Sequence, residues 1–227
     1  MPPIKQPESL LIACQYALEG EVLSGKCCFR RLEDIAEVLP YPVAENFLHK
    51  MLNTNNNTGQ DLASLFTPKI KTLQLNRVND NQSDTDDAIE NDGMIGTLVE
   101  NVEKCTNLQK LEISGSGSPE RSSGVLVREI LMKMDFSKEL QSIKLKNFGS
   151  ALLLNNPEIA SDFLQKLANL EKLEELEVSE ISMDETCLKI LLKLKTLGSL
   201  SLVNSNLSSI QVLQILTGLP RLKFLGN

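Results

Sequence analysis

The 227-residue chain has few of the side chains on which enzymes and metal proteins depend. It contains one histidine, His49, and no tryptophan, and aromatic residues make up only 4% of it. No phosphate-binding glycine loop occurs, and no nucleophile motif accompanies His49. A single histidine without a CxxC pair also argues against a zinc site. We therefore expect a protein that has no catalytic activity and no cofactor, and that acts by binding.

The cysteines, the apolar runs and the charge restrict the cellular setting. The chain has five cysteines, an odd number, which favours reduced thiols in the cytoplasm or the nucleus. No apolar run approaches about 18 residues, so we expect no membrane span. The net charge of −7 argues against nucleic acids and anionic membranes as partners.

Leucine, by contrast, is abundant and recurs in the pattern apolar, two residues, apolar, one residue, apolar. The pattern occurs in IKTLQLN, LQKLEIS, LQSIKLK, LEELEVS and LGSLSLVN, and a last copy begins at Leu222. Its third apolar position falls at residues 75, 113, 145, 178 and 202, which gives steps of 38, 32, 33 and 24 residues. This pattern is typical of the strand of a leucine-rich repeat.

Amphipathic segments separate these strands, at residues 94–104, 123–135, 158–170, 185–195 and 208–217. Asp184 and Ser208 stand where helix N-caps are expected. We therefore predict an α/β fold over residues 61–227: a curved leucine-rich-repeat solenoid with parallel strands on its concave side and helices on its convex side. Residues 76–93 and 114–124 are polar inserts, and the acidic residues of the first do not fit a calcium-binding loop.

Residues 1–60 form a different region, which we call the N-terminal helical module. The sequence predicts helices at about 8–18, 30–38 and 42–52, with a bridging helix around 60–67. Three short helices bury little surface by themselves. The module must therefore pack on the solenoid, on a partner or on both.

The segment SLLIACQYAL, at residues 9–18, resembles the elongin C-binding box, or BC box, of cullin–RING ligase substrate receptors. It matches [S/T/P]-L-x-x-x-C-x-x-x-aliphatic at Ser9, Leu10, Cys14 and Leu18. On a helix, the last three residues form one row. The resemblance implies that Leu10 fills a pocket on elongin C and that the small Cys14 permits a close approach.

The segment LPYPVAENFL, at residues 39–48, is similar to the cullin-2 box at Leu39, Pro40, Val43 and Phe47. Its separation from the BC box is like that in the von Hippel–Lindau box. Proline at this position suits the start of a helix. The LPYP core also resembles the cullin-5 box, but the positions after it depart from that box, which favours cullin-2.

A von Hippel–Lindau-type box followed by leucine-rich repeats resembles the zyg-eleven/zer-one family of cullin-2 RING ubiquitin ligase substrate receptors. The resemblance implies a substrate-recognition subunit that binds elongin C (with elongin B), cullin-2 and an unidentified protein substrate. In that family a C-terminal armadillo-like domain reads degrons, and no position here matches that domain. We therefore expect either a short member of the family or a fragment.

Without such a domain, the substrate surface would be the concave face. The possible contact residues on it are Gln74, Lys110, Glu112, Lys144 and Glu177. They are mixed in charge and lack aromatic rings, whereas binding hot spots favour Trp, Tyr and Arg, so they fit a merely solvated surface equally well. One alternative function is a leucine-rich-repeat scaffold whose N-terminal helices only cap the solenoid. Another, an F-box receptor beginning at LPYP, ignores residues 9–18.

Overall fold

The computed structural model describes residues 41–52, 63–78, 101–115, 128, 131–132, 135–146 and 154–226. The predicted site residues Ser9, Leu10, Cys14, Leu18, Leu39 and Pro40 lie outside these ranges. The described elements are, in chain order, α3 (Tyr41–Leu52), a 3-10 turn (Ala63–Leu65), β1 (Thr72–Val78), a 3-10 turn (Val102–Lys104), β2 (Lys110–Gly115), β3 (Ser142–Lys146), α7 (Pro157–Leu167), β4 (Glu175–Ser179), α8 (Glu185–Leu191), β5 (Ser199–Val203), α9 (Ser209–Gly218) and β6 (Phe224–Gly226).

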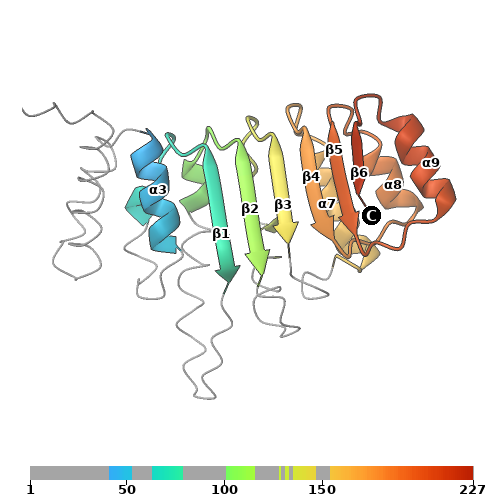
Figure 1. Cartoon of the computed structure of the whole chain (residues 1–227), viewed down its shortest axis with the longest axis horizontal. Helices are drawn as coiled ribbons and strands as arrows, with labels where there is room; N and C mark the ends of the chain where they lie inside the picture. Colours follow the sequence, from blue (N-terminus) through green and yellow to red (C-terminus); the bar gives the residue numbers. More distant parts are fainter. Residues whose placement is uncertain are drawn as a thin grey trace, which may run out of the picture.

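The six strands form one parallel sheet in the order of the sequence, from β1 to β6 (Figure 1). The apolar pattern sets the register, because its second position lies in one row across the sheet: Leu73, Leu111, Ile143, Leu176, Leu200 and Leu225. The predicted strands and the α/β class are thus confirmed. Strand β1 continues to Val78 and β2 to Gly115, so the two predicted inserts begin with residues of the sheet.

The approach to each strand repeats one backbone hydrogen-bond pattern. The carbonyl oxygen of Lys71 accepts from the N–H groups of Gln109 and Lys110, at 2.7 and 2.9 Å. The same double acceptance recurs at the carbonyls of Gln109, Gln141, Glu174 and Gly198. Successive units therefore share a backbone geometry as well as a sequence pattern.

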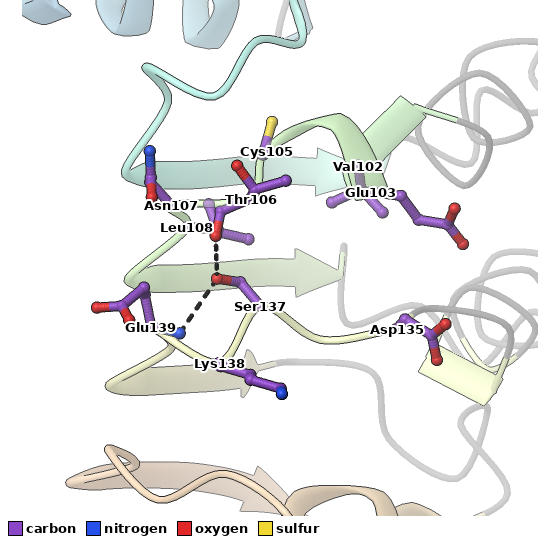
Figure 2. A pocket seen from close by; sticks show the side chains of 10 residues that line it. All are labelled: Val102, Glu103, Cys105, Thr106, Asn107, Leu108, Asp135, Ser137, Lys138 and Glu139. Atoms are coloured by element: carbon purple, nitrogen blue, oxygen red, sulfur yellow. Dashed lines mark hydrogen bonds between the residues drawn. The ribbon is translucent and has the colours of Figure 1, made fainter.

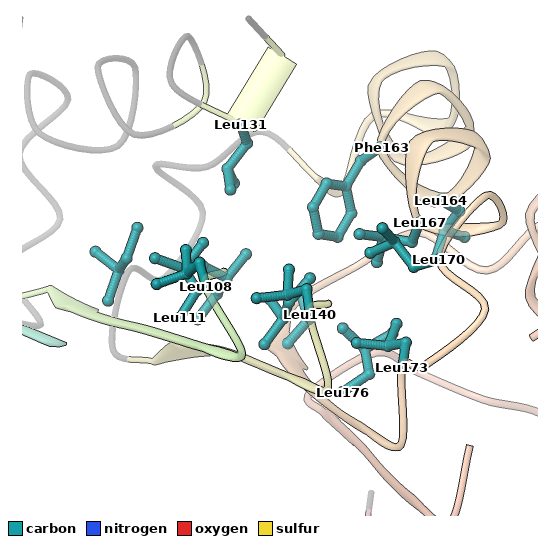
Figure 3. Packing of buried hydrophobic residues seen from close by; sticks show 14 of the residues in the cluster. Leu108, Leu111, Leu131, Leu140, Phe163, Leu164, Leu167, Leu170, Leu173 and Leu176 are labelled. Atoms are coloured by element: carbon teal, nitrogen blue, oxygen red, sulfur yellow. The ribbon is translucent and has the colours of Figure 1, made fainter. Parts of the chain in front are cut away.

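Helices α7 and α8 lie on one face of the sheet, behind it in Figure 1, and leave the other face uncovered. Their inward side chains and those of the strands form one hydrophobic core. In Figure 3, Phe163 and Leu167 of α7 point towards Leu140 and Leu173, which flank the strands. Burial of each such side chain contributes about 1.5–3 kcal/mol, so the regular leucines hold helices and sheet together.

Both predicted N-caps are confirmed. The Asp184 side chain accepts a hydrogen bond from the N–H of Cys187 at 2.7 Å, and Ser208 forms a capping box with Gln211. Helix α8 ends at Leu191 rather than at residue 195, because 3-10-type bonds then turn the chain towards β5. The described ends of α7 and α9 lie within three residues of those expected.

The N-terminal half contains shorter helical pieces than the sequence predicts. Helix α3 matches the segment predicted at 42–52. Of the segments at 60–67 and 94–104, the described parts contain 3-10 turns only, apart from one helical residue at Asn101. Within the described ranges, no helix has the length and apolar character needed to cross a membrane.

Candidate protein-binding face

The uncovered face of the sheet carries all five predicted substrate-contact residues. Register pairs join Gln74 on β1 to Glu112, Glu112 to Lys144, and Lys144 to Glu177 on β4. The same row continues through Ser201 and Gly226. A neighbouring row holds Thr72, Lys110, Ser142, Glu175, Ser199 and Phe224. We call these two rows, with the adjoining Lys146 and Val203, the open face.

Two lysines of β3 form ion pairs with glutamates on both neighbouring strands. Lys144 Nζ lies 2.8 Å from Glu175 Oε1, and the Ser142 hydroxyl donates to Glu175 Oε2 at 2.7 Å. Burial acts to raise the pKa of Glu175, but the hydrogen bonds from Lys144 and Ser142 outweigh it, so the pKa is lowered. The carboxylate therefore stays ionised and bound to its neighbours at neutral pH.

Lys146, which the sequence pattern did not single out, bridges β2 and β4. Its Nζ lies 2.9 Å from Glu112 Oε1 and 3.7 Å from Glu177 Oε2. The hydrogen bond with Glu112 is the main cause of its raised pKa. Because the lysine side chain is one-third exposed, each pair adds at most about 1 kcal/mol to stability. These contacts align the side chains and cancel charge in the middle of the open face.

The end of the open face at β5 and β6 is uncharged and partly apolar. Val203 and Phe224 are 40% and 56% exposed. A Cβ on Gly226 would lie only 3.1 Å from the ring carbon Cε1 of Phe224, so glycine leaves room for the ring beside the strand. The sequence prediction ended this face at Ser201 and so missed Phe224. An exposed aromatic side chain is the kind of residue on which binding hot spots are built.

At the opposite end, α3 covers the edge of β1. Glu45 accepts a hydrogen bond from the N–H of Thr72, and His49 Nε2 lies 2.9 Å from the Thr72 carbonyl oxygen and 3.1 Å from the N–H nitrogen of Gln74. Glu45 and His49 are four residues apart, so they project from one side of the helix. The only histidine of the chain therefore helps to hold α3 against the backbone of the edge strand.

The two described residues of the predicted cullin-2 site, Val43 and Phe47, are buried. Val43 is 9% exposed, and Phe47 is 1% exposed and belongs to the hydrophobic core. The exposed row of the same helix is instead formed by Pro42, Asn46 and Lys50. A partner that contacts α3 would meet this row, whereas Phe47 fixes the position of the helix.

A cavity of about 390 Å³ lies between the segments that lead into β2 and β3 (Figure 2). The Ser137 hydroxyl donates to the Thr106 carbonyl across it at 2.6 Å. Cys105 is at its wall, but burial raises the pKa of this thiol to about 12. The Cys187 thiol, also buried, has a pKa of about 12. Neither is a thiolate at neutral pH, so neither has the reactivity of a nucleophilic cysteine.

No group of three or more His, Cys, Asp or Glu side chains suited to a metal ion occurs in the part of the chain that the structure describes. Comparison of the sequence with protein-family models and with curated proteins gave no match. The functional argument therefore rests on the open face, on α3 and on the sequence motifs.

Proposed function

We propose that the protein is a substrate-recognition adaptor of a cullin-2/elongin B–C RING ubiquitin ligase. In this role it acts without catalysis, in the cytoplasm or the nucleus, by binding a protein substrate on the open face. The observation that carries the proposal is the joining of a six-stranded open face to α3, which begins directly after Pro40 of the cullin-2-box motif. A helix that starts at that proline suits the fixed turn expected of such a box.

We also infer that the sheet and its helices form a curved leucine-rich-repeat solenoid. Three observations support this finer assignment: the repeated apolar motif, the strand order that follows the sequence, and the double hydrogen bond that recurs before each strand. In such a solenoid each unit contacts mainly its neighbours, and the strand side is available for binding.

The proposed roles divide the N-terminal helical module into two contact surfaces. Ser9, Leu10, Cys14 and Leu18 bind elongin C. Leu39 and Pro40 begin the cullin-2 contact, which continues along the exposed row of α3. Val43 and Phe47 support that contact indirectly, because their burial fixes α3 on the sheet.

The bonds between α3 and β1 favour a second candidate function. A helix that satisfies Thr72 and Gln74 with side-chain hydrogen bonds is an effective cap for a sheet edge. The module could therefore cap a leucine-rich-repeat scaffold that has no ligase role. The two functions differ in whether elongin C and cullin-2 bind.

Affinity purification of the full chain from cells tests the proposal. We expect elongin B, elongin C and cullin-2 in the wild-type sample. Leu10→Ala combined with Cys14→Phe should remove all three, because cullin-2 is recruited together with elongin C. Pro40→Ala combined with Asn46→Arg should weaken cullin-2 only.

The matched control for Asn46→Arg is Glu158→Arg, which places the same side chain on an exposed position of α7, far along the chain from α3. It should leave all three partners bound. Equal recovery of elongin C by the wild type and the Leu10/Cys14 variant would refute the ligase role and leave the scaffold function.

A further inference from the structure

The outer side of α9 carries apolar side chains that nothing in the described structure covers. Ile210, Leu213 and Leu216, which we call the α9 stripe, are 71%, 61% and 53% exposed. Ile215 is fully buried in the core. Positions two apart on an α-helix differ by about 200°, so Leu213 points away from the core. Helix α9 is therefore apolar on opposite sides, which is typical of a helix surrounded by protein.

Comparison with α8 shows that the α9 stripe is not a general property of these helices. In both helices the N-cap side chain accepts a hydrogen bond from the N–H of the third helical residue, so their positions correspond. The second and fifth helical residues of α8 are Thr186 and Lys189, and both are exposed. In α9 the same positions hold Ile210 and Leu213. Polar residues on one helix are thus replaced by large apolar residues on the next.

We propose that the α9 stripe is a homodimer interface, in which two copies of the chain pack their α9 helices antiparallel about a two-fold axis. The spacing of the stripe is symmetric, because Leu213 lies three residues from Ile210 and three from Leu216. With Leu213 on the axis, Ile210 of one copy meets Leu216 of the other. A two-fold interface requires this kind of self-complementary surface.

The charges around α9 favour a second copy as the occupant. Helix α9 has no charged residue although the chain has a net charge of −7, so like charges do not meet at this contact. Asp184 adjoins its N-terminal end, where Gln211 Nε2 donates to the Met183 carbonyl. Lys195 adjoins the other end and donates to the Gly218 carbonyl at 2.7 Å. Antiparallel packing places the acidic end of each helix beside the basic end of the other.

A further strand–helix unit beyond β6 would not bury the α9 stripe. Such a unit would pack alongside α9, as α8 packs alongside α7, and would cover a flank of the helix. Leu213 lies opposite the buried Ile215 and would remain in water. The stripe therefore fits a partner on the outer side of the helix layer.

Sedimentation velocity of the full chain over a concentration series tests the proposal. We expect a monomer–dimer equilibrium in the wild type. Ile210→Glu and Leu213→Glu should each weaken association by about 100-fold, because each dimer would enclose two carboxylates in an apolar contact. The matched control is Thr186→Glu, which adds the same charge at the same helical position of α8. It should leave the dimer unchanged.

A mixture of variants tests the axis. Leu213→Glu alone and Leu213→Lys alone should be monomers, whereas their equimolar mixture should form a dimer because position 213 faces itself. A wild-type chain that remains monomeric at about 100 μM would overturn the proposal and leave another protein segment as the occupant. A dimer that tolerates both glutamate variants would also overturn it. So would a mixture of the two Leu213 variants that does not associate.

Discussion

The two edges of the sheet differ in how they meet their surroundings. At β1, α3 lies against the edge, and Glu45 and His49 bind the backbone of Thr72 and Gln74. At β6, the strand pairs with β5 alone among the described residues, and Phe224 is exposed. The first edge is thus closed by the chain itself, and the second has surface available for contacts.

The difference separates structural from binding roles along one repeated architecture. Residues of α3 that resemble a docking motif are partly used to close the sheet, as Phe47 shows. Side chains at the other end, including the α9 stripe, have no structural use that the described residues reveal. The chain therefore spends polar side chains on the closed edge and exposes apolar ones at the open edge.

Truncation of one phenylalanine at each edge should give the largest difference. Phe47→Ala removes a ring that is 1% exposed, so we expect the free energy of unfolding to decrease by about 3–5 kcal/mol. Phe224→Ala removes a ring that is 56% exposed and should change it by less than about 0.5 kcal/mol. Chemical denaturation of both variants measures this. Equal losses would contradict the assignment of a closed and an open edge.

Removal of the polar contacts at the closed edge should have an intermediate effect. Glu45→Ala leaves the Thr72 N–H without its acceptor, which should cost about 1–2 kcal/mol. Amide hydrogen exchange at Thr72 should become faster, with little change at β6. Asn46→Ala, one residue along the same helix and exposed, is the control and should leave the exchange rate at Thr72 as it is. Unchanged protection in Glu45→Ala would show that α3 does not hold the edge.

Acid titration should reveal the smallest effect, in the middle of the sheet between the two edges. The folded-state pKa of Glu175 is lowered from the ordinary value of 4.5. Its ionised form therefore stabilises the fold above about pH 4.5, and this contribution is lost as the pH decreases through the folded-state pKa. Glu175→Gln should make stability less dependent on pH below 4.5, by under about 1 kcal/mol. Glu174→Gln, on the exposed neighbouring residue, should retain the wild-type acid dependence.

The sheet could be predicted from the sequence because its signal is local and repeated. Two apolar residues separated by one position fix which side chains face the core, and the repeat fixes which strands are neighbours. Leu73, Leu111 and Ile143 accordingly lie in register. The same reasoning placed Gln74, Glu112 and the other predicted face residues together.

The contacts that give the two edges their character could not be predicted, because they join residues far apart in the sequence. His49 reaches β1 over 23 residues, and Lys146 reaches Glu112 over 34. No short pattern encodes such distances. Phe224 was missed for another reason: its strand has only three residues, so the last copy of the motif is incomplete.

The most direct test of the proposed function is a binding measurement with purified components. The full chain is titrated with the elongin B–C dimer by calorimetry, and cullin-2 is then added to the product and analysed by size-exclusion chromatography. We predict a one-to-one complex with elongin B–C, followed by a stable assembly that contains cullin-2. A folded wild-type chain that shows no heat of binding and elutes apart from both partners would contradict the role as a ligase adaptor.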